Sequence, residues 1–347
     1  MLIARALIDE LITHANEEAP NECCGVVAVE EGSPCQPARA VSVHPAVNTA
    51  ASPLKFEVDG RELLGLLGAI ESEGLELGAI YHSHTRTQPY PSQTDINFAA
   101  NWPGVEWIIV DRFVMPPEQL PYSTEKPLYL DRCYQVSDRQ REIAPLPTRA
   151  TYGLPEDAFV FCSFNNNFKF TDAVFDSWMR IVRAVEGSVL WLLADNEWAR
   201  ENMLARAEKL GLTRDRLHFA PRVSPAEYLA RFTLADLVLD TFPYNAGTTA
   251  SDTLWMGTPI VTLSGRSYIS RMAGSLLTHI GLPELVTESL ADYERLAIRL
   301  GNQPQRIASY KRYLAEHGRS SPLFDVPAFV RELEIEFERL ALAHRAS

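Results

Sequence analysis

Two histidines, a serine and an aspartate form the most chemically suggestive group in the sequence. His82 and His84 stand two residues apart, and Ser92 and Asp95 follow after a gap of seven residues. Residues two apart on a strand face the same side, so both imidazoles can approach one metal ion. Asp95 lies about one helical turn after Ser92 and can face the same point. Two imidazoles and one carboxylate suit a catalytic zinc ion, which keeps a fourth position for water.

A possible base for such a site, Glu22, stands far upstream and directly before two cysteines and a glycine. A carboxylate beside zinc-bound water can take its proton and later deliver it to a leaving amine. Ser92 could donate a hydrogen bond to the oxyanion that forms on the attacked carbonyl. Each piece alone has a plainer explanation, because paired histidines are usually ordinary side chains and a Ser-x-x-Asp run is typical of a helix cap. The zinc hypothesis therefore depends on the whole arrangement.

A second candidate site lies where a strand, a turn of small residues and a helix start follow one another between residues 236 and 257. Free N–H groups and the helix dipole favour a phosphate at such a start. Thr248 and Thr249 can add hydroxyl donors, and Gly247 allows a ligand to approach the backbone closely. Asp252 is placed to accept hydrogen bonds from ribose hydroxyls.

Lys169 follows the end of another expected strand and could reach the same crevice, because ligands of open α/β sheets bind beyond the carboxyl ends of the strands. Plainer alternatives exist here too. A threonine at a helix start is often only a cap, and a lysine in a polar loop is often a solvated surface residue.

The elements that must position these residues differ between the two parts of the chain. The first part mixes helices and short strands, which suits a small α+β sheet domain with its metal residues at strand and helix ends. Expected here are a helix over the first 20 residues, strands at 24–29, 40–47, 55–58, 77–84 and 105–111, and helices at 60–74 and from Ser92 onward.

From residue 159 onward strands and helices alternate regularly, which predicts a parallel, doubly wound sheet. Strands are expected at 159–164, 188–194, 216–222, 236–242 and 259–265, with helices at 172–185, 196–211, 225–235, 249–257 and 267–281. Two long amphipathic helices, at 292–318 and 326–344, should close the chain. The Pro-punctuated stretch 115–155 has little periodicity and reads as a connection.

Charge and composition exclude some partners. The net charge of −13 argues against nucleic acid and against an anionic membrane surface. The five cysteines are odd in number and show no repeated spacing, so a reducing compartment is the default. No apolar run approaches the roughly 20 residues that a membrane span requires. We expect a cytoplasmic protein.

The spacing of Glu22, His82, His84, Ser92 and Asp95, with the phrase AIYHSHTRTQPYPSQTD, resembles the signature of the JAMM (MPN-plus) metalloproteases. It is most similar to bacterial members that act on ubiquitin-like sulfur-carrier proteins. The resemblance implies a cytidine-deaminase-like domain that holds Zn²⁺ on the two histidines and the aspartate. It also implies water activation by the glutamate and oxyanion stabilisation by the serine.

The later part of the chain resembles a different family. The runs FVFCSFNNNFKF, LADLVLDTFPYNAGTTASDTLWMGTPIVTL and SPLFD are similar to the C-terminal half of the O-linked N-acetylglucosamine transferases. That resemblance implies one Rossmann-like half of a GT-B fold that binds UDP-N-acetylglucosamine. It implies diphosphate contacts from Lys169, Thr248 and Thr249 and a ribose contact from Asp252. Asn166 stands where many members have a glutamine near the phosphates, and Gly247 where many have a histidine.

The two resemblances meet near Trp107, because WIIVD fits a late strand of either family. We therefore predict an α/β chain with a JAMM domain at 1–114, a connection at 115–155 and a GT-B C-terminal domain at 156–347. The JAMM sheet would lack its usual last strand unless the segment KPLYLDRCYQV pairs with its edge. Most of the transferase's N-terminal half is missing. A natural fusion, a chimera and an assembly artefact would each give this sequence.

The leading hypothesis is a zinc-dependent isopeptidase that cleaves the C-terminal linkage of a ubiquitin-like or sulfur-carrier protein, joined to a domain that binds a UDP-sugar. One alternative is a protein glycosyltransferase that uses UDP-N-acetylglucosamine. The other is a nucleotide-sugar-binding module without catalysis.

Overall fold

The structure, a computed structural model, describes residues 1–32, 37–53, 55–83, 85, 107–123, 125–137, 139–194 and 196–346. The chain divides into two compact units, one of Met1–Glu106 with Glu334–Ser347 and the other of Trp107–Leu333. His84, Ser92 and Asp95 lie outside the described residues. The predicted domain limits at residues 114 and 155 stay predictions.

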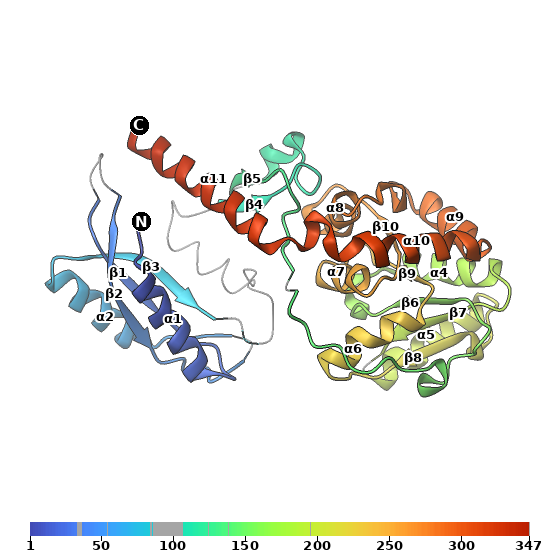
Figure 1. The fold of residues 1–347 in the computed structure, drawn as a ribbon. Coiled ribbons are helices and arrows are strands. Elements are labelled where there is room, and N and C mark those ends of the chain that lie inside the picture. Colours follow the sequence, from blue (N-terminus) through green and yellow to red (C-terminus); the bar gives the residue numbers. More distant parts are fainter. Residues whose placement is uncertain are drawn as a thin grey trace. The chain divides into compact units, whose positions relative to one another are not determined.

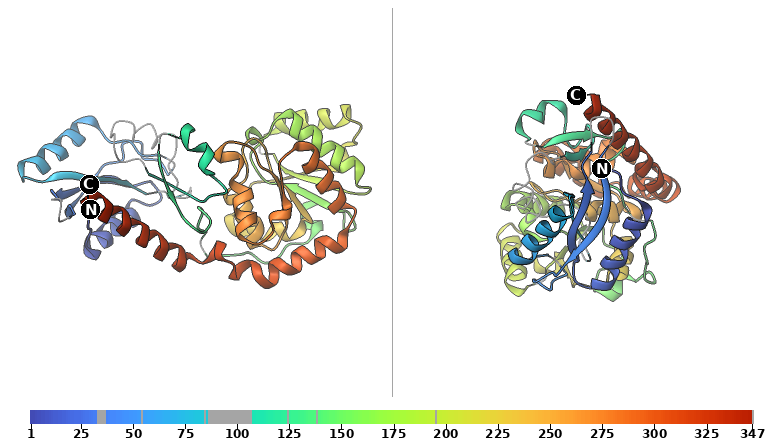
Figure 2. Two further views of the ribbon diagram at one scale, coloured as in Figure 1. Left: turned by 90° about the horizontal axis from the view of Figure 1, so that it is seen from above. Right: turned by 90° about the vertical axis from the view of Figure 1, so that its left-hand side faces the viewer.

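The first unit contains a three-stranded antiparallel sheet with β1 (Cys24–Glu30) between β2 (Arg39–Ala46) and β3 (Glu76–His82). Nearly all of β1 is buried, because a helix covers each face of the sheet. Helix α1 (Arg5–Glu18) packs on the side of Val27 and Val29. Helix α2 (Gly60–Ser72) packs on the side of Val26 and Ala28 (Figure 2).

The predicted elements of this unit that fall on described residues are present apart from one. The helix predicted from Ser92 onward lies outside the described residues. The expected strand at 55–58 is wrong, because these residues form a loop. Phe56 in that loop is buried against Cys24 and Ala46, so its burial, and not a strand, explains the apolar alternation.

The second unit begins with a small parallel pair, β4 (Trp107–Val110) and β5 (Lys126–Tyr129), joined through the 3₁₀ helix Pro117–Tyr122. Among the described strands, β5 pairs with β4 and not with β1, β2 or β3. The segment beginning at Lys126 therefore pairs with β4, the WIIV run, and does not replace a strand of the first sheet.

The core of the second unit is a six-stranded parallel sheet in the order β11-β10-β9-β6-β7-β8. The chain enters in the middle at β6, runs outward to β8, returns to β9 beside β6 and runs outward again. This is the predicted doubly wound sheet. Its switch point lies between β6 and β9, where such folds bind ligands. The strands are β6 (Val160–Ser163), β7 (Val189–Leu193), β8 (Leu217–Ala220), β9 (Leu237–Leu239), β10 (Ile260–Leu263) and β11 (Val286–Thr287).

Helices cover both faces of this sheet, so its strands are almost wholly apolar (Figure 1). They are α4 (Asp172–Ala184), α5 (Glu197–Lys209), α6 (Pro225–Arg231), α7 (Thr248–Trp255), α8 (Met272–His279), α9 (Leu290–Gly301), α10 (Pro304–His317) and α11 (Val326–Ala346). The single helix predicted at 292–318 is wrong, because α9 ends at Gly301 and α10 begins at Pro304. Proline suits a first helical turn but not a helix interior.

No helix among the described residues is both long enough and apolar enough to cross a membrane.

Candidate functional site

The switch point brings two predicted segments together. Beyond β6 the chain runs through the 3₁₀ turn Asn167–Lys169, and beyond β9 it runs through residues 240–247 into α7. The Tyr244 amide donates to the Lys169 carbonyl at 3.3 Å. The Lys169 ammonium lies 4.3 Å from the centroid of the Tyr244 ring, a cation–π contact. Lys169 therefore stands against the turn that leads into α7.

The start of α7 presents free backbone donors. The helix begins at Thr248, and Gly247 before it supplies no capping side chain. The first N–H groups of a helix have no partner within the helix, so an uncapped start favours an anion. Thr248 is exposed, and Thr249 is partly buried with its carbonyl accepting from Thr253 Oγ1 at 2.7 Å.

Two side chains stand close to Gly247. A β-carbon added at Gly247 would lie 2.5 Å from the Met272 Cε and 3.3 Å from the Gln135 Oε1. The first of these distances is shorter than real contacts between carbon atoms. Met272 and Gln135 thus fill the space that a side chain at position 247 would need.

Asp252 is held by a partner that the sequence did not indicate. Its buried carboxylate accepts a hydrogen bond from Arg141 Nη1 at 2.6 Å and another from the Tyr228 hydroxyl. Burial raises the pKa of Asp252, while Arg141 and Tyr228 oppose that rise. The Tyr228 hydroxyl also contacts the Thr249 side chain, so it links the two predicted residues of α7.

Asn166 follows β6 and contacts the segment after β8. Its Oδ1 accepts from Arg222 Nη2 at 3.3 Å, and Arg222 comes from the loop after β8. The predicted polar residue is therefore at the carboxyl end of the sheet, as its place after β6 requires.

Asp240 is more buried than the predicted acid Asp252, and sequence reasoning missed it. It directly follows β9 and is 1% exposed. Burial raises its pKa to about 7, against the lowering effects of its hydrogen bonds and of Lys169. Burial also lowers the pKa of Lys169, and Asp240 raises it. The sequence feature that could have revealed Asp240 is an acid placed directly after a wholly apolar strand.

Several buried polar atoms at the same strand ends have no hydrogen-bond partner among the described residues. Such groups are rare in folded proteins and call for a ligand, an ion or water. The atoms without a partner are Ser163 Oγ at the end of β6, both amide atoms of Asn165 after it, Asn245 Oδ1 after β9, Ser264 Oγ after β10, and Gln135 Nε2 beside Gly247.

The first unit places Glu22 and His82 at one end of its sheet. Strand register sets Cys24 opposite His82, and the pairing continues as the Cys23 amide donates to Ser83 Oγ at 2.8 Å. Glu22 is 3% exposed, and its carbonyl accepts from Asn48 Nδ2 at 2.8 Å. The His82 ring stacks on Phe56 with centroids 4.5 Å apart.

The chain matches two family models. Residues 132–333, more than half of the chain, match glycosyl transferase family 41. The chain belongs to glycosyl transferase family 41. Residues 4–120 match the prokaryotic homologues of the JAB domain, so this member of family 41 carries a JAB-like domain at its N-terminal side.

Relatives of the family 41 member share its transferase part. A probable UDP-N-acetylglucosamine–peptide N-acetylglucosaminyltransferase, SEC, of Arabidopsis thaliana is 30% identical over 74% of this chain and 27% of its own length. The Caenorhabditis elegans UDP-N-acetylglucosamine–peptide N-acetylglucosaminyltransferase is 38% identical over 54% of this chain and 16% of its own. This chain therefore spans only a minor part of either relative.

A solved structure agrees with the observed fold. A lysine-to-methionine variant of the Thermobaculum terrenum O-GlcNAc transferase superposes with a TM-score of 0.62 and 28% identity. The match covers 70% of this chain and 46% of that one. The predicted pairing of a JAMM-like domain with half of a GT-B fold is confirmed by these matches.

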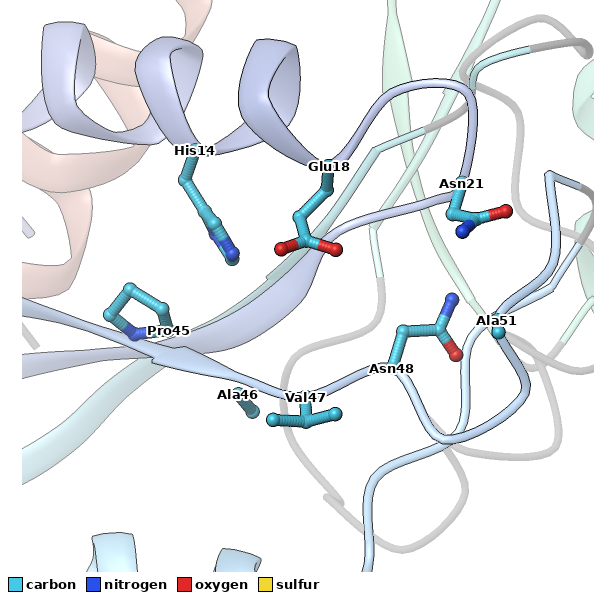
Figure 3. A pocket seen from close by; sticks show the side chains of 8 residues that line it. All are labelled: His14, Glu18, Asn21, Pro45, Ala46, Val47, Asn48 and Ala51. Atoms are coloured by element: carbon cyan, nitrogen blue, oxygen red, sulfur yellow. The ribbon is translucent and has the colours of Figure 1, made fainter.

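The JAB-like part of the family 41 member also has a cavity of about 260 Å³ (Figure 3). His14 and Glu18 of α1 reach toward the end of β2 and the loop after it. Asn21, which directly precedes Glu22, lines its far side. The full lining is His14, Glu18, Asn21, Pro45, Ala46, Val47, Asn48 and Ala51.

One group of possible metal ligands among the described residues is better explained without a metal. Asp111, Cys133 and His279 have ligand atoms within 4.8 Å of one another. However, the Asp111 carboxylate already accepts from the amides of Phe113, Val114 and Tyr134 and from the Ser275 hydroxyl. A carboxylate with four donors is a structural link between β4, the following segment and α8.

Proposed function

We propose that the family 41 unit binds a UDP-sugar, UDP-N-acetylglucosamine, at the switch point between β6 and β9. The main support is the placement of Lys169 against the turn that opens into the uncapped start of α7. A cation and a helix N-terminus at one strand edge are the combination that a diphosphate requires.

Roles follow for the remaining residues. Lys169 would pair with the diphosphate, and the amides and hydroxyls of Thr248 and Thr249 would donate to it. Gly247 would allow the close approach, and Asn166 would lie near the phosphates. The Asp252 carboxylate would accept from the ribose hydroxyls while Arg141 holds it in place.

Transfer of the sugar to a peptide acceptor is the alternative that goes further. The names of the relatives favour it, since both are called N-acetylglucosaminyltransferases that act on peptides. Transfer also needs a surface that faces the donor and holds the acceptor. Binding without transfer would make this unit a nucleotide-sugar sensor or docking module.

Calorimetric titration of the full chain with UDP-N-acetylglucosamine tests the proposal. A Lys169→Met variant should bind at least tenfold more weakly, because a charge-assisted phosphate contact contributes roughly 1.5–3 kcal/mol. Lys209→Met is the matched control, since Lys209 is an exposed lysine in the last turn of α5. Equal loss in both variants would remove the specific role of Lys169. Incorporation of radiolabelled sugar into protein, lost with Lys169→Met, would separate transfer from binding alone.

For the JAB-like unit we propose a zinc-dependent isopeptidase that acts on the C-terminal linkage of a ubiquitin-like or sulfur-carrier protein. The support is the family match together with Glu22 and His82, which are brought to one end of the sheet by adjacent strands. The imidazoles of His82 and His84 and the carboxylate of Asp95 form a donor set of the kind that zinc takes. The bound metal would polarise the scissile carbonyl and its water.

The protein groups divide the remaining work. Glu22 takes the proton of the attacking water and delivers it to the leaving amine. Ser92 donates a hydrogen bond to the oxygen of the tetrahedral intermediate. Burial of the Glu22 side chain suits this role, because a base shielded from bulk water keeps its proton for the leaving group.

Elemental analysis of the purified chain beside a His82→Ala variant tests the site. We expect about one zinc per chain, lost in the variant. A well-folded chain that binds no zinc would exclude the isopeptidase and leave the UDP-sugar site as the remaining proposal.

A further inference from the structure

The Asp240 carboxylate is buried directly after β9, at the start of the turn that leads to the proposed diphosphate site. Its carboxylate accepts from the Thr241 amide at 2.7 Å and from the Ala246 amide at 2.8 Å. These two amides begin and end the turn between β9 and Gly247. One carboxylate oxygen thus accepts from both ends of the turn and closes it directly before the start of α7.

The turn also supports Lys169. Tyr244, whose ring lies under the Lys169 ammonium, belongs to the turn that Asp240 closes. Thr241 Oγ1 donates to the Tyr244 carbonyl at 2.6 Å, which holds the backbone of Tyr244 within the turn. Both parts of the phosphate site, the cation and the helix start, therefore depend on Asp240.

The charges around Asp240 are few. Among the described residues, the titratable groups that interact with it are the Lys169 ammonium and the Tyr293 hydroxyl, which donates to the Asp240 carbonyl at 2.9 Å. Without a ligand, one cation faces one anion. A bound diphosphate adds two negative charges, and interactions between charges are strong where water is excluded. Lys169 and Arg222, which contacts Asn166, supply two positive charges against the three negative charges of Asp240 and the diphosphate, so the site keeps an excess of negative charge.

The hydrogen bonds of Asp240 allow it to become neutral. The two amides can donate to one oxygen in either protonation state. The other oxygen accepts from Thr262 Oγ1 at 2.6 Å, and a hydroxyl can turn from donor to acceptor. A proton on that oxygen would keep a partner, so protonation breaks no part of the turn.

We propose that Asp240 is a positioning residue of the donor site that takes up one proton from solvent when a UDP-sugar binds, with the Thr262 hydroxyl turning to accept its hydrogen bond. This inference rests on the proposed UDP-sugar site. The acid shapes the site in its charged form and removes its own repulsion as the diphosphate arrives. Its raised pKa, near 7, puts this exchange within the physiological range.

Calorimetry measures the proton directly. The full chain is titrated with UDP-N-acetylglucosamine at pH 7.5 in buffers of different ionisation enthalpy. The diphosphate of this ligand has no group that titrates near that pH. We expect a substantial fraction of a proton to be taken up per site. Affinity should fall with rising pH above about 7, by up to about tenfold per pH unit.

Two variants decide the assignment. Asp240→Asn keeps an oxygen for the two amides but cannot ionise, so it should abolish the uptake, flatten the pH profile and bind more tightly than wild type at pH 8.5. Thr262→Val removes the hydroxyl that donates to the charged acid, so it should raise the pKa of Asp240 in the free protein and lower the uptake at pH 7.5, because part of the proton is then bound before the ligand. Thermal melts verify that both variants fold.

The possible failures are distinguishable. Clear binding by the wild type without proton uptake would overturn the role of Asp240 and leave the UDP-sugar site intact. Unchanged uptake in Asp240→Asn would assign the proton to another group, such as Lys169, and would also overturn it. A folded wild type that does not bind UDP-N-acetylglucosamine would overturn the proposed site itself.

Discussion

Arg141 donates to the carboxylate of Asp252 across 2.6 Å and so fastens the segment before the six-stranded sheet to the middle of α7. A second link lies beside it, where the hydroxyls of Ser137 and Ser251 are 2.6 Å apart. The helix whose start is the proposed phosphate site is thus held from outside the sheet by Ser137 and Arg141. Asp252, the residue proposed to contact the ribose, is part of that attachment.

Replacing Arg141 with Gln should destabilise the chain, because Asp252 would remain buried without its cation. The Asp252 side chain is 4% exposed and Arg141 is 22% exposed, so the pair is shielded from water. Loss of one partner of a buried pair costs about 3 kcal/mol or more. Urea unfolding measures the change. The double variant Arg141→Gln/Asp252→Asn should recover much of the loss, and equal stability of the single variant and wild type would contradict a structural role for the pair.

Adding a methyl group at Gly247 should disturb the start of α7. The new β-carbon would meet Met272 Cε at 2.5 Å, so either Met272 or the helix start must move. Because Met272 Cε is the end of a flexible side chain that can turn away, we expect Gly247→Ala to lose no more than about 1 kcal/mol of stability and to bind UDP-N-acetylglucosamine more weakly.

Met272→Ala supplies the control for that change. If the clash with Met272 is the cause, Gly247→Ala/Met272→Ala should recover ligand affinity relative to Gly247→Ala. Persistent loss of affinity in the double variant would instead point to a need for close ligand approach to the backbone.

The parallel sheet and its crevice were predictable because buried parallel strands appear as short apolar runs, and the polar residues after them meet at one edge. Lys169 and the turn at 247–249 were found in this way. Arg141 and Asp240 were not, because their roles arise from contacts that no local pattern encodes. Arg141 meets Asp252 from 111 positions away in the chain.

Periodicity in the sequence also gave one wrong helix and one wrong strand. Periodicity predicted one helix over 292–318, and Pro304 divides it in two. Alternation predicted a strand at 55–58, but these residues form a loop whose Phe56 side chain is buried in the core. The predicted zinc residues His84 and Asp95 and the predicted oxyanion donor Ser92 lie outside the described residues and stay predictions.

Replacing Glu22 with Gln should separate catalysis from metal binding in the JAB-like unit. Glutamine keeps the size of the side chain but cannot take a proton from water, so peptidase turnover should fall by at least about 100-fold. Zinc content should stay at the wild-type level, because Glu22 is not one of the proposed ligands. Assays on a ubiquitin-like adduct, run beside elemental analysis, check both expectations. Full turnover in Glu22→Gln would exclude Glu22 as the base.

The stability of the chain should depend on pH through Asp240. Burial raises the pKa of this acid to about 7 in the folded protein, above the ordinary value of 3.8. The folded state therefore holds the proton more tightly than the unfolded state. The resulting stability is fully present below the unfolded pKa and is lost as pH rises through about 7.

Asp240→Asn removes this dependence because the amide does not titrate. The free energy of unfolding of the wild type, measured in urea at pH 5 and pH 8, should decrease more with rising pH than that of Asp240→Asn. Asp252, whose pKa burial also raises, changes stability in the same direction in both proteins and cancels in the comparison. Parallel pH profiles for the two proteins would mean that Asp240 is already charged at pH 5. The carboxylate would then keep its charge when a diphosphate binds, and Lys169, Arg222 and the helix start would have to offset that repulsion.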